Sequence, residues 1–505
     1  MMSVRSLPPR NIARCGPGLA VRAAAVLAVA LSVAAPARAE TTPAQAAALE
    51  AQIRGFIARQ LGAVLDASTL AVRATPAGDS VKLELPLGGA MLRGLIEASP
   101  GILTAQVKPL DGGRYAIEDM RIPSPLTLSL ARTGTDKPSS MTIKLAEQTI
   151  TGMLDTTLAT RSNFDTRLRG YSVTVDGAEG PRTSHIDLVD GHTVWSPRGG
   201  ARADVTGDLA AEKYATANAL PGGGTMNISA DRLTGSSKLE NLDFDRLGTL
   251  VQTAAAFGAS IDAAAKGDDK AKLTPAQRTM VRAMLTAFGE LMDGMASNQT
   301  LESVRLTASG QTGTLKKLSF GFAGSAPGGL LEMRMPILLE GPDSPVIPQG
   351  AMREMLPKLV SLVPKFTGVP KAELMAILQR ALDVEEPDTD VIQAELIEMV
   401  GKHPITVGIE KLAIELGLAS LRGDGAVKVS AANNIQGDGE FRMTGLDALI
   451  RRVNTAPELK PAGPALIFLK GIGKADGRDM VWHITYADKA LMVNDTNMTE
   501  MMPGK

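Results

Sequence analysis

A cluster of histidine and aspartate side chains within eight residues is the densest group of potential metal ligands in the sequence. On a β-strand, His185 and Asp187 would share one face, because side chains alternate between the two faces. A turn at Asp190 and Gly191 could bring His192 back beside them, and two imidazoles with one carboxylate suit zinc or iron. The alternative is that these residues form the wet face of a hairpin. The sequence therefore offers His185, Asp187 and His192 as a metal site or as solvated hairpin residues.

Other catalytic arrangements are poorly represented in this chain. The sequence contains no G-x-S-x-G elbow and no H-E-x-x-H helix, the patterns typical of serine hydrolases and zinc proteases. Only four histidines occur, so few side chains can act as a general base near neutral pH. We therefore expect no catalytic residue and no cofactor, and an enzyme is the less favoured class.

A second group of residues could bind an apolar ligand. Methionine is frequent, with 23 residues, whereas aromatic residues make up only 3% of the chain. Methionine is flexible and adapts to irregular cavities and irregular ligands alike. Apolar residues at helical spacing over 274–296 form one stripe, and the members that could line a groove are Met280, Met284, Phe288, Met292 and Met295. The same stripe could instead fill a protein core.

Two kinds of hydrophobic periodicity place these groups on different elements. A helix is expected at residues 43–65, and apolar and polar residues then alternate through a strand-rich stretch at 80–235. Helical periodicity follows at 244–296, and strands return at 301–339. Strands that alternate in this way form an antiparallel sheet with one packed face and one wet face.

A second unit is expected to begin after residue 340. Residues 340–348 contain three prolines, which suit neither a helix nor a central strand, so the boundary separates units 40–340 and 341–505. The elements expected in the second unit are helices within 351–401, the first at 351–363, strands and helices over 405–505, and hairpin turns at the Gly-Asp-Gly triplets 423–425 and 437–439.

The order of elements predicts an internal repeat. In each unit a strand leads into a helix with an aspartate near its start, Asp245 in the first and Asp447 in the second, about 200 residues apart. Such an aspartate can cap exposed N–H groups and favours the helix dipole. The expected fold is of the α+β class: one or more elongated antiparallel β-sheets from two similar halves, each half with inserted amphipathic helix pairs packed on one sheet face.

The first 39 residues have the layout of a secretory signal peptide. Four arginines from Arg5 to Arg22 come without an acidic residue, the apolar run 23–35 follows, and Ala37 and Ala39 fit the small-residue cleavage pattern. The apolar run has 13 residues, whereas a membrane-spanning helix needs about 20. We expect cleavage after Ala39 and export to the periplasm. The alternative is an uncleaved segment that anchors the chain in the inner membrane.

Cleavage would also set the chemistry of the mature chain. It would remove the only cysteine, Cys15, and so exclude disulfides, thiolate metal sites and cysteine nucleophiles. Five arginines would leave with it, and the remaining 48 basic and 54 acidic residues would give a net charge of −6. A chain of that charge without a basic stripe does not predict nucleic-acid binding. No other stretch offers about 20 apolar residues in a row, so no stable transmembrane span is expected.

The last 80 residues or so carry a resemblance. A Gly-Asp-Gly triplet is followed by Gly445-Leu-Asp-Ala-Leu, apolar helices and a final stretch from Trp482 to Asn494. In this order the chain resembles bacterial exported proteins of the YdgA-like and AsmA-like kind. Those end in an Asp-Gly-type turn and a Leu-x-Val-Asn-Gly-type strand, whereas here Lys489 replaces the turn glycine and Asp495 follows Asn494. The resemblance implies an envelope protein with a long curved sheet whose apolar face is shielded by helices or holds lipid.

Together these observations favour a non-enzymatic periplasmic protein that binds lipid or another envelope protein through an apolar groove between sheet and helices. One alternative is a metal-dependent envelope hydrolase that uses the cluster from His185 to His192. The other is a purely structural scaffold. The scaffold is not separated from the first interpretation, because core and groove stripes look the same in a sequence.

Overall fold

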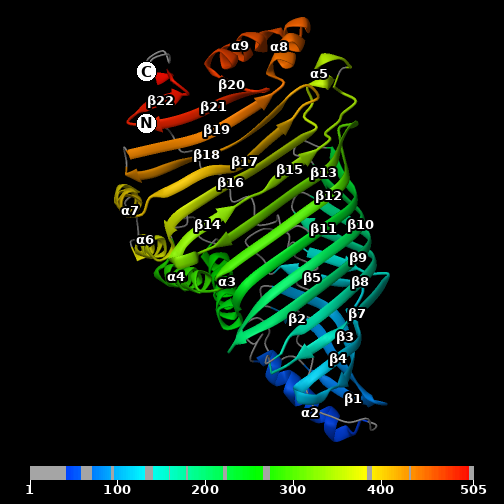
Figure 1. Cartoon of the computed structure of the whole chain (residues 1–505). Coiled ribbons are helices and arrows are strands. Elements are labelled where there is room, and N and C mark those ends of the chain that lie inside the picture. Colours follow the sequence, from blue (N-terminus) through cyan, green and yellow to red (C-terminus); the bar gives the residue numbers. More distant parts are fainter. Residues whose placement is uncertain are drawn as a thin grey trace.

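The computed structural model describes residues 41–58, 71–91, 96–130, 140–157, 160–177, 180–219, 224–264, 273–347, 349–383, 389–431 and 434–499. These residues are arranged around one antiparallel β-sheet, in which the 23 described strands are joined by hydrogen bonds. Most helices lie at the ends of the strands, and α2 (Pro43–Phe56) lies beside the first strands of the sheet (Figure 1). The structure is therefore of the α+β class that the periodicity predicts.

Strands and helices are numbered in chain order. The strands are β1 (Arg73–Ala77), β2 (Ser80–Met91), β3 (Ile96–Pro109), β4 (Arg114–Arg121), β5 (Leu126–Leu130), β6 (Ser140–Lys144), β7 (Glu147–Asp155), β8 (Ser162–Gly177), β9 (Gly180–Gly199), β10 (Arg202–Ala219), β11 (Thr225–Asp243), β12 (Gly294–Ala308), β13 (Gln311–Ser325), β14 (Leu330–Arg334), β15 (Ile337–Glu340), β16 (Leu359–Pro370), β17 (Ile405–Glu415), β18 (Ser420–Ala431), β19 (Asn434–Thr444), β20 (Lys474–Asp476), β21 (Asp479–Ala487), β22 (Ala490–Val493) and β23 (Thr496–Asn497). The helices are α2 (Pro43–Phe56), α3 (Phe244–Ala264), α4 (Pro275–Gly289), α5 (Ala351–Glu354), α6 (Lys371–Asp383), α7 (Thr389–Lys402), α8 (Leu446–Thr455) and α9 (Gly463–Ile472).

Neighbouring strands in the sheet are also neighbours in the chain. From β8 to β13, each strand pairs antiparallel with the strand before it and the strand after it. At three places in the strand order, two short strands lie end to end beside one long neighbour. These are β4 with β5, β6 with β7, and β14 with β15. The sheet is thus a meander that starts at β1 and ends at β22 and β23, and the colours of Figure 1 follow this order.

The helices are inserted between strands that pair with each other. Helices α3 and α4 connect β11 to β12, α6 and α7 connect β16 to β17, and α8 and α9 lie between β19 and β21. Successive strands run in opposite directions, so the helices fall at the two ends of the strands. Helices α3, α4, α6 and α7 lie at one end and α8 and α9 at the other (Figure 1). The first two insertions touch, since the Nε2 of Gln379 donates to the Oγ1 of Thr286 at 2.9 Å.

The helix starts follow from their capping residues. Thr274 accepts a hydrogen bond from the N–H of Gln277 and precedes a proline, so α4 begins where the sequence predicts. In α3 the capping residue is Asp243, which accepts from the N–H of Arg246 at 3.0 Å. The expected cap, Asp245, already belongs to the first helical turn. Helix α8 likewise carries Asp447 in its first turn and begins without a side-chain cap.

Two helices are shorter than their periodicity predicts. The helix expected through residue 296 ends at Gly289, and residues 294–308 form β12, which pairs with β11 and β13. Of the helix expected at 351–363, only α5 is helical, because β16 begins at Leu359 and pairs with β15 and β17. In both segments the hydrogen bonds to neighbouring strands prevail over helical spacing.

The expected hairpin turns at the Gly-Asp-Gly triplets lie inside strands instead. Triplet 423–425 lies in β18 and triplet 437–439 in β19, and the two face each other with Gly425 opposite Gly439. A Cβ atom at Gly425 would come within 3.1 Å of the Cα of Gly439. The glycines are therefore required by the close approach of two backbones.

The sheet continues across the expected unit boundary at residue 340. Strand β15 ends at Glu340, β16 begins at Leu359, and these two residues pair. The largest apolar cluster, which we call the main core, draws its buried residues from α2, the strands before β12 and the start of α3, together with Leu291. Three smaller clusters lie in the later strands and helices.

A row of left-handed residues keeps the apolar side chains on one face of the sheet. In β8, Leu168 and Tyr171 are both buried, although residues three apart in a regular strand point to opposite faces. Gly170 lies between them with φ 57°, and the register of β8 with β9 is the same on both sides of it, so its left-handed conformation restores the alternation without an extra residue. Lys213 in β10 and Ser303 in β12 have φ 55° and 54° in the same row of the ladder. The apolar face therefore continues on both sides of this row.

Candidate functional site

The histidine cluster lies on β9 and forms two separate pairs. His185 and Asp187 share a face, as the strand period predicts, and the Nε2 of His185 is 2.9 Å from the Oδ1 of Asp187. His192 pairs with Asp165 of β8, with 2.7 Å between its Nδ1 and the Oδ1 of Asp165. The four side chains are 45% to 59% exposed, so both pairs face water.

The structure does not bring His192 to the other two predicted ligands. The turn expected at Asp190 and Gly191 is wrong, because both residues lie inside β9 and pair with β8 and β10. His185 and His192 are seven residues apart along this extended strand, which corresponds to about 23 Å. Within the described ranges, no group of three or more His, Cys, Asp or Glu side chains is close enough to hold a metal ion.

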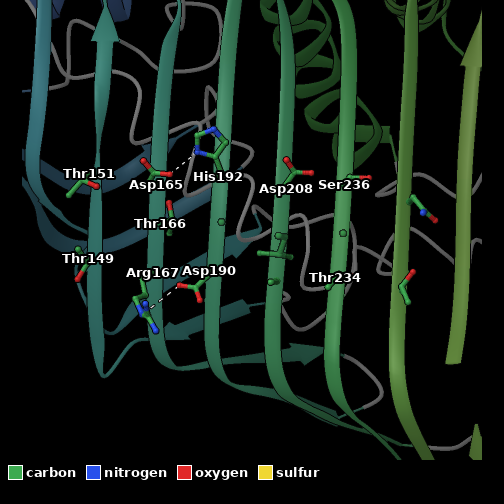
Figure 2. A pocket seen from close by; sticks show the side chains of 16 residues that line it. Thr149, Thr151, Asp165, Thr166, Arg167, Asp190, His192, Asp208, Thr234 and Ser236 are labelled. Atoms are coloured by element: carbon green, nitrogen blue, oxygen red, sulfur yellow. Dashed lines mark hydrogen bonds and ion pairs between the residues drawn. The ribbon is translucent and has the colours of Figure 1, made fainter. Parts of the chain in front are cut away.

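His192 instead lines a shallow hollow of about 630 Å³ on the polar face of strands β7 to β12 (Figure 2). We call it the polar hollow. Its lining residues are Thr149, Thr151, Asp165, Thr166, Arg167, Asp190, Gly191, His192, Asp208, Leu209, Ala210, Thr234, Gly235, Ser236, Asn298 and Thr300. Opposed residues of an antiparallel sheet point to the same side, so the polar members form rows across the strands.

Charged side chains of the polar face pair with one another. In the polar hollow, the Nε of Arg167 is 3.6 Å from the Oδ1 of Asp190, beside the pair of His192 and Asp165. Within the left-handed row, the Nζ of Lys213 is 2.9 Å from the Oδ1 of Asp231. That hydrogen bond raises the pKa of Lys213 and lowers the pKa of Asp231, so both stay charged near neutral pH. These paired, exposed charges are those of a solvated face.

The opposite face carries a continuous row of apolar side chains from β8 to β21. Each strand position contributes one residue, and each residue is in direct register with the next. We call this the central apolar row, and its members are Leu168, Val189, Ala211, Leu233, Leu301, Leu318, Leu339, Val360, Ile414, Leu421, Met443 and Met480. Residues in register share a face, so the row is one surface feature that crosses the sheet.

The first part of the central apolar row is buried, and a later part is half-buried and lies outside the apolar clusters of the described residues. Leu168 and Val189 are at most 3% exposed and belong to the main core. None of the apolar clusters of the described residues contains Leu318, Leu339, Val360 or Ile414. In the neighbouring row of the same face are Phe320, Ile337, Leu362 and Leu412, of which Phe320 is 42% and Ile337 38% exposed. These eight residues define the open apolar face.

Helices pack on the apolar face of the sheet near the ends of the strands. Phe366 of β16 packs in a cluster with Ile377 of α6 and Met399 of α7. At the other end, Leu466 of α9 packs with Met443 of the central apolar row. The open apolar face adjoins both clusters: Leu362 precedes Phe366 by four residues on β16, and Ile414 pairs with Leu421 of the second cluster.

The predicted methionine stripe is divided among three elements. Met280, Met284 and Phe288 lie on α4, Met292 follows the end of that helix, and Met295 belongs to β12. Phe288 is 60% and Met295 39% exposed, whereas Met292 packs against the main core. The stripe is broken because α4 ends at Gly289 and the chain enters the sheet.

Sequence reasoning missed the central apolar row. Alternation identifies its members as apolar residues of separate strands, but only the register places them in line. A local signal exists in hairpins with short connections: Leu301 and Leu318 are equally distant from the tight turn at Ser309 and Gly310, and they pair, as Ile414 and Leu421 do on either side of residues 416–419. Where helices separate paired strands, as between β11 and β12 or between β16 and β17, the long connection hides the corresponding symmetry.

Two further findings bear on the class of protein. Among the helices of the described ranges, none is both long and apolar enough to cross a membrane. Comparisons of the chain with protein-family models, with curated proteins and with solved structures find no match.

Proposed function

We propose that this chain is a non-enzymatic protein of the bacterial envelope that binds the acyl chains of lipids on its open apolar face. The observation that carries the proposal is the central apolar row. The buried part of the row packs inside the main core. The later part offers the same aliphatic surface, but its residues belong to none of the apolar clusters formed by the described residues. Burial of apolar surface yields about 25 cal/mol per Å², so an apolar ligand is the favoured occupant.

The shape of the face suits an acyl chain. Neighbouring strands are about 4.8 Å apart, so the three steps from β13 to β17 give a length of about 14 Å. The hydrocarbon core of a bilayer, which is two acyl chains deep, is about 30 Å thick. The open apolar face is therefore about as long as one acyl chain.

The chemistry of the face favours lipid over a protein partner. A protein interface typically includes about ten hydrogen bonds. The open apolar face presents aliphatic and aromatic side chains, and its strands are interior ones whose backbone groups pair with two neighbours. An acyl chain needs no hydrogen bonds and loses nothing on such a surface.

The proposal includes the two similar halves, each with a helix pair on this face of the sheet. Leu247 and Leu250 of α3 pack against the main core in the first half. Leu466 of α9 packs with Met443 and Met480 in the second half. Helices in these positions would flank a lipid that lies across the strands.

The envelope location rests on the sequence. The basic, apolar and small-residue segments before Glu40 are typical of a cleaved signal peptide. The resemblance of the C-terminal residues to exported YdgA-like and AsmA-like proteins agrees with that location. We propose the periplasm as the site of action.

The test compares two adjacent residues of β16. Val360 belongs to the open apolar face, whereas Ser361 points to the other face and pairs with the same two strands. Val360→Gln should weaken binding of a fluorescent fatty acid by about tenfold, because a polar amide replaces apolar surface at the centre of the site. Ser361→Gln is the matched control and should bind like the parent protein.

Native mass spectrometry of the gently purified protein provides the second measurement. Co-purified phospholipid that disappears in Val360→Gln supports the proposal. A parent protein that carries no lipid and binds no fatty acid contradicts it, as does equal binding by the two variants. A stable complex with another envelope protein on the same face, in place of lipid, contradicts it as well.

A further inference from the structure

Helix α9 exposes large apolar side chains at the end of the molecule that is remote from α2 (Figure 1). Three consecutive residues, Ile467, Phe468 and Leu469, are 54%, 43% and 42% exposed. Leu466 and Ile472 of the same helix pack inward against the C-terminal clusters. The helix is therefore apolar on its outer side as well as on its packed side, which is unusual for a helix that faces water.

The outer side of α9 is held rigidly in place. The indole Nε1 of Trp482 donates to the carbonyl oxygen of Leu469 at 2.8 Å, and the Nδ2 of Asn494 donates to the carbonyl oxygen of Ile472 at 2.8 Å. Gly463 packs against Asn454, where a Cβ atom would come within 2.5 Å of the Asn454 Oδ1. The exposed residues thus cannot turn inward without breaking these contacts.

Basic residues slightly outnumber acidic residues around α9, although Arg452 of α8 is paired with Glu354 of α5. The helix contains no acidic residue, and the exposed Lys460 and Lys474 flank it. Residues 446–479 carry six basic and four acidic side chains, whereas the whole chain carries 53 and 54. The only basic residue within the helix, Lys470, pairs with Asp447 of α8 at 2.6 Å. This end of the molecule therefore combines exposed apolar residues with a local excess of positive charge.

We propose that α9 docks on the surface of a lipid bilayer that contains anionic lipids, with Ile467 and Phe468 in the region between headgroups and acyl chains. Ten helical residues span about 15 Å, half of the hydrocarbon thickness, so α9 lies along the surface rather than across it. Apolar side chains flanked by lysines are the composition of interfacial helices. The inference does not depend on lipid binding at the open apolar face.

Helix α7 provides a matched control. Val391 is 54% exposed, the same as Ile467, and lies at the opposite end of the strands. In contrast to α9, helix α7 carries three acidic residues and one lysine. If exposed apolar side chains were sufficient, both helices would bind a vesicle. If basic residues are needed as well, only α9 should bind.

The test places one environment-sensitive fluorophore on the full chain. Cys15→Ser removes the only native thiol, and a nitrobenzoxadiazole label is then attached at Phe468→Cys or at Val391→Cys. Vesicles of phosphatidylcholine with about one-third phosphatidylglycerol are added. We expect a blue shift and a several-fold rise in emission at position 468, quenched by lipids that carry a nitroxide near the headgroup, and neither change at position 391.

Further variants separate the two contributions to docking. Replacing Ile467 and Leu469 together by serine should weaken vesicle binding at position 468 by at least about tenfold. Lys460→Glu with Lys474→Glu should weaken binding to the anionic vesicles but not to phosphatidylcholine alone. These variants alter exposed side chains, and circular dichroism verifies that the fold is retained.

The inference is overturned if the label at position 468 stays in water when the protein is bound to vesicles. It is also overturned if the emission shifts without vesicles as the protein concentration rises, because a second copy of the chain would then cover α9. Equal responses at positions 468 and 391 would likewise contradict it. Each of these results leaves the fatty-acid test of the open apolar face unaffected.

Discussion

Asp155 holds the turn between β7 and β8 with a carboxylate that is almost fully buried, the residue being 1% exposed. Its Oδ1 accepts from the backbone N–H and the hydroxyl of Thr157 at 2.8 and 2.6 Å. Its Oδ2 accepts from the same two groups of Thr160, both at 2.6 Å. Asp155→Ala would remove all four hydrogen bonds at once, and Asp155→Asn would remove the charge while keeping the shape.

The expected loss of stability follows from these four bonds. A hydrogen bond to a charged group contributes about 1.5–3 kcal/mol when its donor would otherwise remain buried and unpaired. Thr157 and Thr160 are exposed, so water can replace part of the loss. We therefore take about 0.5–1 kcal/mol for each bond, which gives about 3 kcal/mol for Asp155→Ala and about half of that for Asp155→Asn.

The pH dependence of the free energy of unfolding provides an independent test of the same hydrogen bonds. Burial alone would raise the pKa of Asp155, but the hydrogen bonds from Thr157 and Thr160 outweigh it and hold the pKa below its usual range. A carboxyl group with a lowered pKa binds a proton more weakly in the folded state than in the unfolded state. Its stabilisation is present above the unfolded pKa of about 3.9 and is lost as the pH falls through the folded value. The deficit of Asp155→Asn should therefore shrink below about pH 4.

Urea unfolding followed by circular dichroism at pH 7 and at about pH 3 measures both effects. The matched control is Asp165→Asn, which changes a carboxylate that is 59% exposed and should remain close to the parent protein. A deficit of less than about 0.5 kcal/mol for Asp155→Ala at pH 7 would refute the reasoning. So would a deficit of Asp155→Asn that is the same at both pH values.

Two further substitutions test the packing of the main core. The Tyr171 hydroxyl is buried without a hydrogen-bond partner in the described structure, and burial raises its pKa. Tyr171→Phe should therefore leave the free energy of unfolding, measured with urea, unchanged or raise it by up to about 1 kcal/mol. A clear loss of stability would indicate a hidden partner for the hydroxyl. Phe244, at the start of α3, is 6% exposed and stacks on Trp195 with 5.1 Å between ring centroids. Phe244→Ala should cost about 3–5 kcal/mol and change the tryptophan fluorescence, whereas Phe288→Ala, at a residue that is 60% exposed, should do neither; similar losses for both would contradict this packing.

Features that depend on nearby residues could be predicted from the sequence. Strands β2 to β11 fill the strand-rich stretch expected from residue 80, and α4 begins at Pro275, where the helical stripe expected from residue 274 starts. The sharing of a face by His185 and Asp187 follows from the strand period alone. Each of these features involves residues only a few positions apart, so propensity and period are sufficient.

Features that depend on distant strands could not be predicted in this way. Residues 351–363 have helical spacing, yet most of them lie outside α5 because β15 and β17 offer hydrogen bonds to β16. The Gly-Asp-Gly triplets have turn chemistry, yet they lie opposite each other inside paired strands. Local preference is worth a few tenths of a kcal/mol per residue, and a completed ladder outweighs it.

The sequence by itself determined which side chains are apolar, their alternation along each strand and the glycine positions where backbones can approach. The tertiary structure decided which of those side chains stand in one line, because register is set by hydrogen bonds between strands. It also decided that His192 lies beside Asp165 and far from His185. Cross-strand neighbours are distant in the chain, and no period along a single strand contains their identity.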